Sequence, residues 1–242
     1  MSPGPEPSRP EHKLKEAKRQ ATFVTARFEK WFLPKLAARL PAWVLPDHLT
    51  GLGILAATAI GVAYGLSNRD PNWLWAVNAA LVVHWLGDSL DGTLARVRKI
   101  ERPRYGFYLD HLTDAYSTCV IGIGLGLSPY LLLSVGLAIV MAYLVLSINV
   151  YLETHVFGRF EYGYGLVGPT EARLLLIGLN TLALTAGPIP FSFFGRGVTI
   201  YDVVGTVGAI MMIGLLLIRA RRNLQELARQ EPANTRRADP AA

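Results

Sequence analysis

Residues 72–96 of this chain read NWLWAVNAALVVHWLGDSLDGTLAR, an apolar run that ends in two aspartates and an arginine. A helix needs about 20 mostly apolar residues to cross the hydrocarbon core of a bilayer. The segment Asn72–Arg96 meets that length, and its aspartates, Asp88 and Asp91, lie near its carboxyl end. We therefore predict a membrane-spanning helix that carries acidic groups toward one side of the membrane.

Five more apolar blocks accompany this segment in a chain of 242 residues, of which 51% are hydrophobic and 17% are charged. These blocks are Asp47–Leu66, Tyr105–Leu127, Tyr130–Leu152, Thr170–Ala186 and Tyr201–Ile218. Turn-forming residues separate several of them, as in Ser67–Pro71 and Gly187–Pro190. A soluble protein with buried helices is the alternative, but six such blocks in so short a chain favour the membrane. The predicted fold class is all-α, a polytopic bundle of six transmembrane helices.

The basic residues indicate how the bundle is oriented. If the N-terminus is cytoplasmic, 22 of the 24 Lys and Arg residues fall in cytoplasmic segments, and only Arg69 and Arg196 fall outside. Membrane proteins show this bias because cytoplasmic loops carry an excess of basic residues. We therefore place both termini and the aspartates on the cytoplasmic side. The net charge of +6 then reflects contact with anionic lipid headgroups and not with nucleic acid.

The chain divides into three parts. Residues 1–46 form a cytoplasmic segment whose amphipathic stretch, Phe23–Leu40, is typical of a helix that lies in the membrane interface. A helix packed on the bundle is the alternative for that stretch. Residues 47–218 form the transmembrane domain with the candidate site, and residues 219–242 form a cytoplasmic tail. The one cysteine, Cys119, excludes an intrachain disulfide and a cysteine metal cluster.

Four aspartates in two neighbouring spans are the most informative residues. An aspartate near the centre of a transmembrane helix costs about 2.5–3.5 kcal/mol. Asp88 and Asp91 are three residues apart, and Asp110 and Asp114 are four apart, so each pair shares one helix face. Two antiparallel helices can turn these faces toward each other, where the carboxylates repel. One or two divalent cations relieve this repulsion, and oxygen ligands suit Mg²⁺ and also Mn²⁺ or Ca²⁺.

Small residues flank these acids. Gly92, Ala95 and Gly106 each lie beside an aspartate or one helical turn from it. A glycine inside a helix costs about 1 kcal/mol relative to alanine, a cost that close approach of a ligand explains. Close packing of two helices is the alternative explanation. Arg96 follows at the predicted membrane edge, where it is placed to meet a phosphate.

The stretch Asp88–Arg96, followed by Gly106-x-x-x-Asp110-x-x-x-Asp114, resembles the signature of the CDP-alcohol phosphotransferases. Every fixed residue of that signature is present, at a spacing that the family allows. The resemblance extends to Trp43–Thr50, which is similar to the Pro-Asn-x-x-Thr sequence that begins the family's first span. Asp47 stands where the family usually has asparagine. Since six spans also match, the resemblance covers most of the chain.

The resemblance implies an integral membrane enzyme, often a homodimer. Such an enzyme transfers a substituted phosphate from a CDP-linked donor to an alcohol acceptor and releases CMP. The resemblance also implies a metal site open to the cytoplasm, with Asp88, Asp91 and Asp110 as ligands of Mg²⁺. Asp114 would be a further ligand or the general base for the acceptor hydroxyl. The residues implied to hold the cytidine nucleotide are Gly92, Ala95, Arg96 and Gly106.

His111 follows Asp110 directly, as a histidine does in the choline and ethanolamine phosphotransferase branch, where it resembles a general base. Histidine suits that role because it titrates near neutral pH. A histidine on the neighbouring helix face, directed away from the site, is the alternative. Membership of this branch favours a donor such as CDP-choline or CDP-ethanolamine with a diacylglycerol-like acceptor. The reverse arrangement, CDP-diacylglycerol with a small polar alcohol, stays open.

Two further residues have two interpretations each. His84 lies one turn before Asp88 and either lines the site or packs in the bundle. Glu171 begins the fifth predicted span and either caps that helix or reaches the metal or the headgroup.

Two other classes of protein also carry intramembrane acids. A membrane prenyltransferase binds a pyrophosphate through Mg²⁺ and aspartates, and a cation carrier binds the transported ion. A metal-dependent CMP product separates the phosphotransferase from both.

Overall fold

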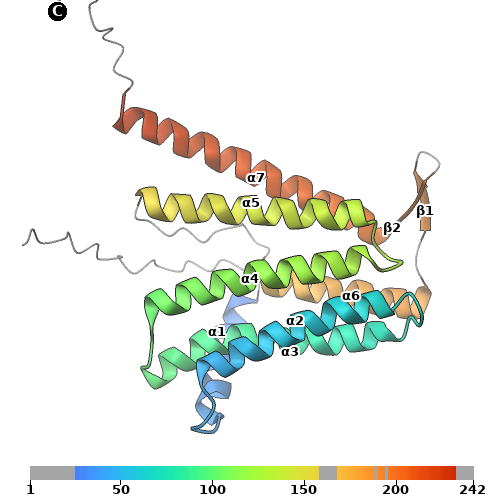
Figure 1. Ribbon diagram of the computed structural model, residues 1–242, viewed down its shortest axis with the longest axis horizontal. Helices are drawn as coiled ribbons and strands as arrows, with labels where there is room; N and C mark the ends of the chain where they lie inside the picture. Colours follow the sequence, from blue (N-terminus) through green and yellow to red (C-terminus); the bar gives the residue numbers. More distant parts are fainter. Residues whose placement is uncertain (1–24, 158–167, 188–189, 194–195, 233–242) are drawn as a thin grey trace, which may run out of the picture.

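A computed structural model describes residues 25–157, 168–187, 190–193 and 196–232. These residues form seven α-helices and two β-strands, which Figure 1 shows in chain order. The elements are α1 (Ala26–Arg39), α2 (Pro46–Leu66), α3 (Trp73–Arg98), α4 (Pro103–Gly126), α5 (Leu133–Phe157), α6 (Pro169–Ala186), β1 (Pro190–Phe193), β2 (Arg196–Thr199) and α7 (Ile200–Gln230).

The six predicted blocks all form helices, α2 to α7, and each helix begins within three residues of its predicted start. By length and composition, α2, α5 and α7 are long and apolar enough to cross a membrane. The other three are less apolar because α3 and α4 carry the aspartates and α6 carries Glu171 and Arg173. The helical membrane-type fold is therefore confirmed, whereas six membrane spans stay a prediction.

Two details differ from the sequence prediction. Between α6 and α7, the strands β1 and β2 pair antiparallel, with Pro190 opposite Thr199, so the fold is not purely helical. The helix α7 also continues to Gln230, so the first part of the segment predicted as a tail is helical. Arginine, glutamate and leucine in that part favour a helix, and Pro232 follows its end.

The helix α2 packs against both α3 and α4, and glycines permit the close approach. A Cβ added to Gly87 of α3 would lie 2.7 Å from the backbone nitrogen of Gly53 and 2.7 Å from the carbonyl oxygen of Leu49. A Cβ added to Gly124 of α4 would lie 2.5 Å from Cα of Gly61. Small residues let helix backbones touch in this way. The helix α2 therefore fixes where α3 and α4, with their aspartates, lie.

The remaining helices extend the bundle on both sides. Figure 1 shows α7 beside α5, α4 beside α5 and α6 beside α3, in agreement with the packing of these pairs. The outer faces of α5 and α7 are apolar, since Met141, Ile148, Ile210 and Leu217 are each more than half exposed. Exposed apolar surface of this extent is typical of a protein face that contacts lipid.

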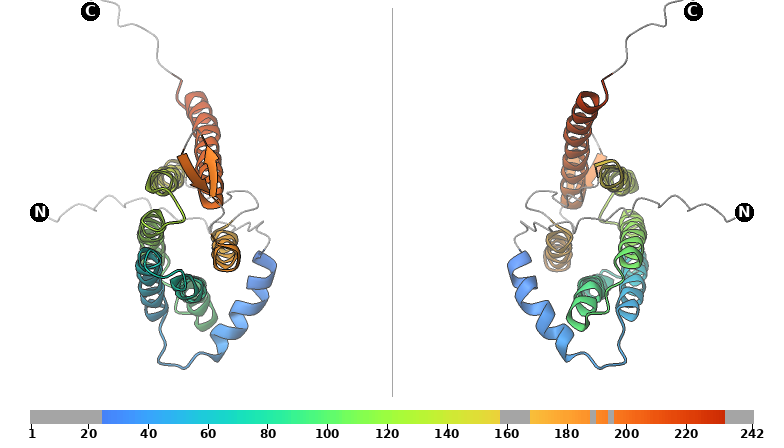
Figure 2. Two further views of the ribbon diagram at one scale, coloured as in Figure 1. Left: turned by 90° about the vertical axis from the view of Figure 1, so that its right-hand side faces the viewer. Right: turned by 90° about the vertical axis from the view of Figure 1, so that its left-hand side faces the viewer.

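The helix α1 crosses the bundle. Figure 2 shows the helices of the bundle along their axes, whereas α1 is seen from its side. It buries Leu33 and Ala37 against a cluster with α3 and leaves Phe28 and Trp31 more than half exposed. One face of the predicted amphipathic stretch thus packs on the bundle and the other faces outward. Its position in the membrane interface stays a prediction. Residues 23–24 of that stretch lie outside the described residues.

A buried polar network joins four helices. Oδ1 of Asn180 (α6) accepts the hydroxyl groups of Tyr64 (α2) and Tyr201 (α7), each at 3.1 Å. Nδ2 of Asn180 donates to Oδ1 of Asn78 (α3) at 2.8 Å, and Nδ2 of Asn78 donates to Thr181 at 3.3 Å. We call Tyr64, Asn78, Asn180 and Tyr201 the asparagine network. It lies on the part of α3 that precedes the aspartates.

Candidate active site

The four aspartates come together from two helices. Asp88 and Asp91 lie in the second half of α3, and Asp110 and Asp114 lie in the first half of α4. Electrostatic interactions link Asp114 with the other three carboxylates, and Asp91 with Asp88 and Asp110. Such interactions require nearby charges because Coulomb energy falls with distance. All four side chains are half-buried, and we call them the carboxylate cluster.

Asp88 is paired with an arginine from another helix. Nη2 of Arg173 (α6) donates to Oδ2 of Asp88 at 2.6 Å. Nε of the same guanidinium donates to Nδ1 of His84 at 3.0 Å. His84 is buried, and the side chains of Arg173 and Asp88 are only 11% and 24% exposed. His84 therefore lies at the edge of the carboxylate cluster, where it holds the arginine that binds Asp88.

Asp91 is held by α2 and by its own helix. Oγ1 of Thr50 donates to Oδ2 of Asp91 at 2.7 Å, and the backbone N–H of Gly92 donates to Oδ1 at 2.5 Å. Thr50 ends the stretch that resembles the start of the family's first span. This contact gives the stretch a structural purpose, since it fixes one carboxylate of the cluster.

Asp47, which stands where the family usually has asparagine, pairs with the turn between α3 and α4. Nη2 of Arg102 donates to its two carboxylate oxygens at 2.5 and 2.7 Å. The guanidinium also lies over the ring of Tyr105, 3.9 Å from the ring centroid. The hydrogen bonds from Arg102 to Asp47 raise the pKa of the guanidinium. Asp47 is thus paired outside the carboxylate cluster, near the surface.

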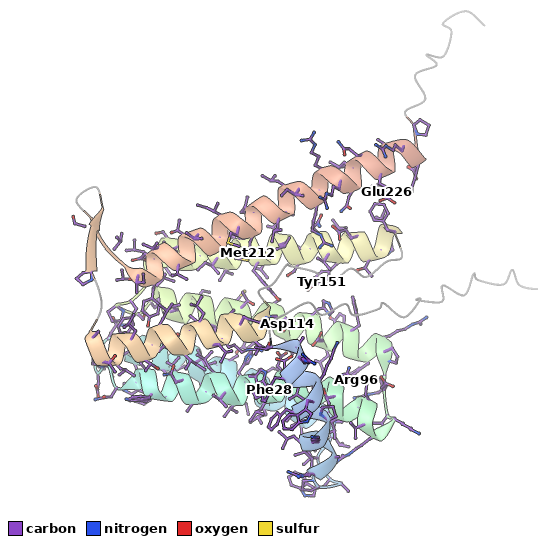
Figure 3. All side chains as sticks on the ribbon, turned by 180° about the vertical axis from the view of Figure 1, so that it is seen from behind. Phe28, Arg96, Asp114, Tyr151, Met212 and Glu226 are labelled. Carbon is purple, nitrogen blue, oxygen red and sulfur yellow. The ribbon has the colours of Figure 1, made fainter. Side chains whose placement is uncertain are left out.

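His111 packs between α4 and α5. Its Nδ1 donates to the carbonyl oxygen of Phe107 at 2.6 Å and lies 3.7 Å from Oδ2 of Asp110. Its ring lies 5.0 Å from the ring of Tyr151, centroid to centroid, and is edge-on to it. Tyr151 in turn interacts electrostatically with Asp114, and Figure 3 shows these two residues near the middle of the bundle. His111 therefore borders the carboxylate cluster and is buried.

The two glycines of the motif do not serve helix packing. A Cβ at Gly106 would meet nothing within 4 Å, and a Cβ at Gly92 would meet only the guanidinium of Arg96, at 3.4 Å. Gly106 therefore faces open space, and the group nearest to Gly92 is the end of a side chain from its own helix, which fits the ligand-approach interpretation. Ala95 is half-buried, and Arg96 is exposed and donates from Nη2 to the hydroxyl of Thr93 at 3.1 Å. Figure 3 shows Arg96 on the side of the bundle where α1 crosses.

Glu171 takes the helix-capping role. Its Oε2 accepts the backbone N–H of Gly168 at 2.9 Å, as in a capping box. Its Oε1 accepts both the backbone N–H and the hydroxyl of Thr25, at 2.8 and 2.9 Å. Both carboxylate oxygens thus hold backbone at the start of α6 and the start of α1.

The sequence analysis did not predict that Arg173 belongs to the site, or that Thr50 binds Asp91. A cation within an apolar helix is a sequence signal that points to Arg173, because buried charges in membrane segments are paired. That Asp88 is the partner of Arg173 could not be predicted from the sequence, since the two residues are 85 positions apart.

The comparison with known proteins accords with this geometry. The sequence profile described as CDP-alcohol phosphatidyltransferase matches residues 43–228, from the end of the α1–α2 connection into α7. The chain belongs to the CDP-alcohol phosphatidyltransferase family. The family resemblance of the aspartate motif is thereby confirmed.

A curated relative points to one branch of this family. The chain is 24% identical over 192 residues to cholinephosphotransferase 1 of Danio rerio, an alignment that covers 73% of this chain and 48% of that protein. The chain thus spans about half the length of the relative that it matches. This match agrees with the predicted resemblance to the choline and ethanolamine phosphotransferase branch.

The carboxylate cluster fits a divalent cation by its donor atoms. Four carboxylates supply the hard oxygen ligands that Mg²⁺ and Mn²⁺ prefer, and their mutual repulsion favours a bound cation. Among the described residues, no group of three or more His, Cys, Asp or Glu side chains is arranged as a metal site. Two of the carboxylates have protein partners, since Arg173 donates to Asp88 and Thr50 donates to Asp91.

Proposed function

We propose that this protein is a Mg²⁺-dependent CDP-alcohol phosphotransferase of phospholipid biosynthesis. It transfers a substituted phosphate from a CDP-linked donor to an alcohol acceptor and releases CMP. Mn²⁺ is expected to replace Mg²⁺, since both ions take oxygen ligands. Family membership and the aspartate motif support this proposal.

One observation carries the proposal: beside the carboxylate cluster lie two helical glycines, Gly92 and Gly106, whose Cβ positions no other helix contacts. Carboxylates alone are compatible with a carrier or a prenyltransferase. A helical glycine with no neighbour, at Gly106, has no packing reason and suits close approach of a ligand. Gly92, Ala95, Arg96 and Gly106 would hold the cytidine nucleotide, with Arg96 placed for a phosphate.

Asp88, Asp91, Asp110 and Asp114 would hold the cation. The bound metal supplies charge neutralisation at the pyrophosphate and thus makes CMP a better leaving group. The residues themselves orient the substrates, since fixing two reactants in an attack geometry removes much of the entropic barrier. Thr50 contributes by fixing the rotamer of Asp91 through its 2.7 Å hydrogen bond.

His111 or Asp114 would take the proton of the acceptor hydroxyl. Because a carbonyl oxygen only accepts, the 2.6 Å contact with Phe107 assigns the proton of the His111 ring to Nδ1. The lone pair then lies on Nε2, the atom available to act as a base. A change in the side-chain contacts of α5 is needed to expose this buried ring to a substrate.

The favoured substrates are a CDP-choline-like or CDP-ethanolamine-like donor and a diacylglycerol-like acceptor. The histidine after Asp110 and the match to cholinephosphotransferase 1 of Danio rerio support this choice. The alternative is the same chemistry with CDP-diacylglycerol as donor and a small polar alcohol as acceptor.

The proposed protein is an integral membrane homodimer with six spans. The bias of Lys and Arg supports cytoplasmic termini and an active site open to the cytoplasm. A prenyltransferase and a cation carrier remain the rival classes, and the match of the family profile to residues 43–228 disfavours both.

Release of CMP by the purified full chain in lipid vesicles tests the proposal. The donors are CDP-choline, CDP-ethanolamine and CDP-diacylglycerol, each with a matched acceptor and with Mg²⁺ or a chelator. We expect Mg²⁺-dependent CMP from a headgroup donor with diacylglycerol. CMP from CDP-diacylglycerol alone would reverse the donor, and absence of CMP with every pair would contradict the phosphotransferase assignment.

A further inference from the structure

The guanidinium of Arg173 binds a carboxylate, that of Asp88, which is also expected to hold a divalent cation. Nη2 of Arg173 lies 2.6 Å from Oδ2 of Asp88, a distance typical of a charge-assisted hydrogen bond. Asp88 is also a proposed metal ligand. A positive guanidinium and a positive ion repel each other across one carboxylate, so each weakens the binding of the other.

We propose that Arg173 is a positioning residue that competes with the divalent cation for Asp88 and then binds the donor phosphate. This inference rests on the proposed function, because it deepens the account of the same site. Arg173 neutralises Asp88 before the cation arrives. When the cation takes the carboxylate, the guanidinium turns away from Asp88.

His84 restricts this movement to one end of the guanidinium. It accepts Nε of Arg173 at 3.0 Å, while the Nη2 end of the same guanidinium holds Asp88. Because Nε and Nη2 are separate ends of a rigid fork, the contact with His84 serves as a pivot while the Nη2 end changes partner. His84 lies on α3, one turn before Asp88, so the pivot and the carboxylate belong to one rigid helix.

A phosphate is the partner that the displaced guanidinium meets. Mg²⁺ in proteins is held by carboxylates together with substrate phosphates, so a phosphate that accompanied the cation would lie near Asp88. The planar guanidinium matches a phosphate with two parallel hydrogen bonds. The same arginine thus opposes cation binding by itself and favours binding of the nucleotide that accompanies the cation.

Arg173 is proposed to weaken cation binding and to strengthen nucleotide binding, and these opposite effects can be tested. Mn²⁺ binding to purified full chain in lipid nanodiscs is measured by the loss of the free-ion signal in electron paramagnetic resonance. CMP binding is then measured at saturating Mn²⁺ by calorimetry. For Arg173→Gln we expect Mn²⁺ to bind about tenfold more tightly, since a charge-assisted hydrogen bond no longer competes, and CMP to bind about tenfold more weakly.

Arg219→Gln is the matched control. Arg219 (α7) is also a poorly exposed arginine that pairs with a carboxylate, Glu153 of α5, outside the carboxylate cluster. This variant loses an ion pair of the same kind, but we expect both affinities to stay within about twofold of the wild type. It separates a loss of stability from a change at the cation site.

Two further variants keep the test decisive if Arg173→Gln does not fold. Arg173→Lys keeps the positive charge but cannot bind His84 and Asp88 at the same time. His84→Ala keeps the charges of Arg173 and Asp88 but removes the contact that serves as the pivot. In both variants we expect tighter Mn²⁺ binding and weaker CMP binding than in the wild type, with smaller changes than in Arg173→Gln. Unchanged or weaker Mn²⁺ binding in all three variants would overturn the inference, as would absence of Mn²⁺ binding in every variant and the wild type.

Failure of the proposed role of Arg173 can be distinguished from failure of the proposed reaction. If the wild type does not release CMP from any CDP-alcohol but the Mn²⁺ and CMP affinities of the variants change in opposite directions, the proposed reaction is wrong and the role of Arg173 stands. If CMP is released and the affinities do not move, the reaction stands and this role of Arg173 is wrong.

Discussion

The asparagine network and the carboxylate cluster are two polar regions of one helical bundle. The helix α3 contributes to both, and α6 carries both a residue of the network and the arginine that binds the cluster. Asn78 and Asp88 both lie on α3, and Asn180 and Arg173 both lie on α6. In the asparagine network, each amide or hydroxyl group faces a neutral partner, and Asn180 and Tyr64 are fully buried. In the carboxylate cluster, charges of one sign face one another in half-buried positions.

The difference indicates which region serves structure and which serves chemistry. A buried polar network whose donors and acceptors are paired fixes the arrangement of helices and requires no ligand. Like charges in a bundle oppose folding and are retained where a cation or a substrate uses them. Substitutions in the two regions should therefore separate, with loss of activity at the carboxylate cluster and loss of stability at the asparagine network.

The largest effect is expected for Asp91→Asn, which removes one oxygen charge from the carboxylate cluster. Metal stabilisation of transition-state charge amounts to several kcal/mol, and each 1.36 kcal/mol is a factor of ten. We therefore expect kcat for CMP release to fall by about a thousandfold or more, while the thermal unfolding of the purified protein stays close to that of the wild type. Asp70→Asn, in the loop between α2 and α3, is the control and should keep its rate. Near-normal turnover of Asp91→Asn would disprove the metal assignment.

His111→Ala should come second. Loss of a general base typically lowers a rate by about 10²–10⁴-fold, and the buried position of His111 leads us to expect the lower end. The affinity for CMP should stay unchanged because His111 is not among the residues proposed to hold the nucleotide. His155→Ala, at the exposed end of α5, is the matched control. An unchanged kcat would transfer the base role to Asp114 and would leave His111 as a packing residue between α4 and α5.

Much of this bundle could be predicted from the sequence because its signals are local. Apolar length locates each helix, and the spacing of Asp110 and Asp114 places both on one face, so neither step needs a distant residue. The partners of the aspartates are not local, since Arg173 and Thr50 lie 85 and 41 residues away from Asp88 and Asp91. The hairpin of β1 and β2 was also missed, because four-residue strands are too short to give a periodic pattern.

Asn180→Leu should change stability without changing the chemistry. The substitution keeps the size of the side chain but leaves the hydroxyl groups of Tyr64 and Tyr201 and the amide of Asn78 without this partner. Interhelical hydrogen bonds in membranes contribute about 0.6 kcal/mol each, so three lost bonds predict a destabilisation of about 2 kcal/mol. Denaturant unfolding in mixed micelles measures it, and kcat per folded protein should equal that of the wild type. Equal stability, or a lower kcat per folded protein, would contradict the division between the two regions.

The smallest effect is expected at Asp47, which lies outside both regions. Asp47→Asn restores the residue that the family usually has and removes the ion pair with Arg102. Both side chains are about half exposed, and exposed ion pairs add little because water and salt screen them. We expect Tm to change by less than about 4 °C and kcat to stay within about twofold, with Arg102→Gln giving the same result. A large loss of kcat in Asp47→Asn alone would mean that the carboxylate itself acts in the site. The boundary of the chemical region would then extend from α3 and α4 to the start of α2.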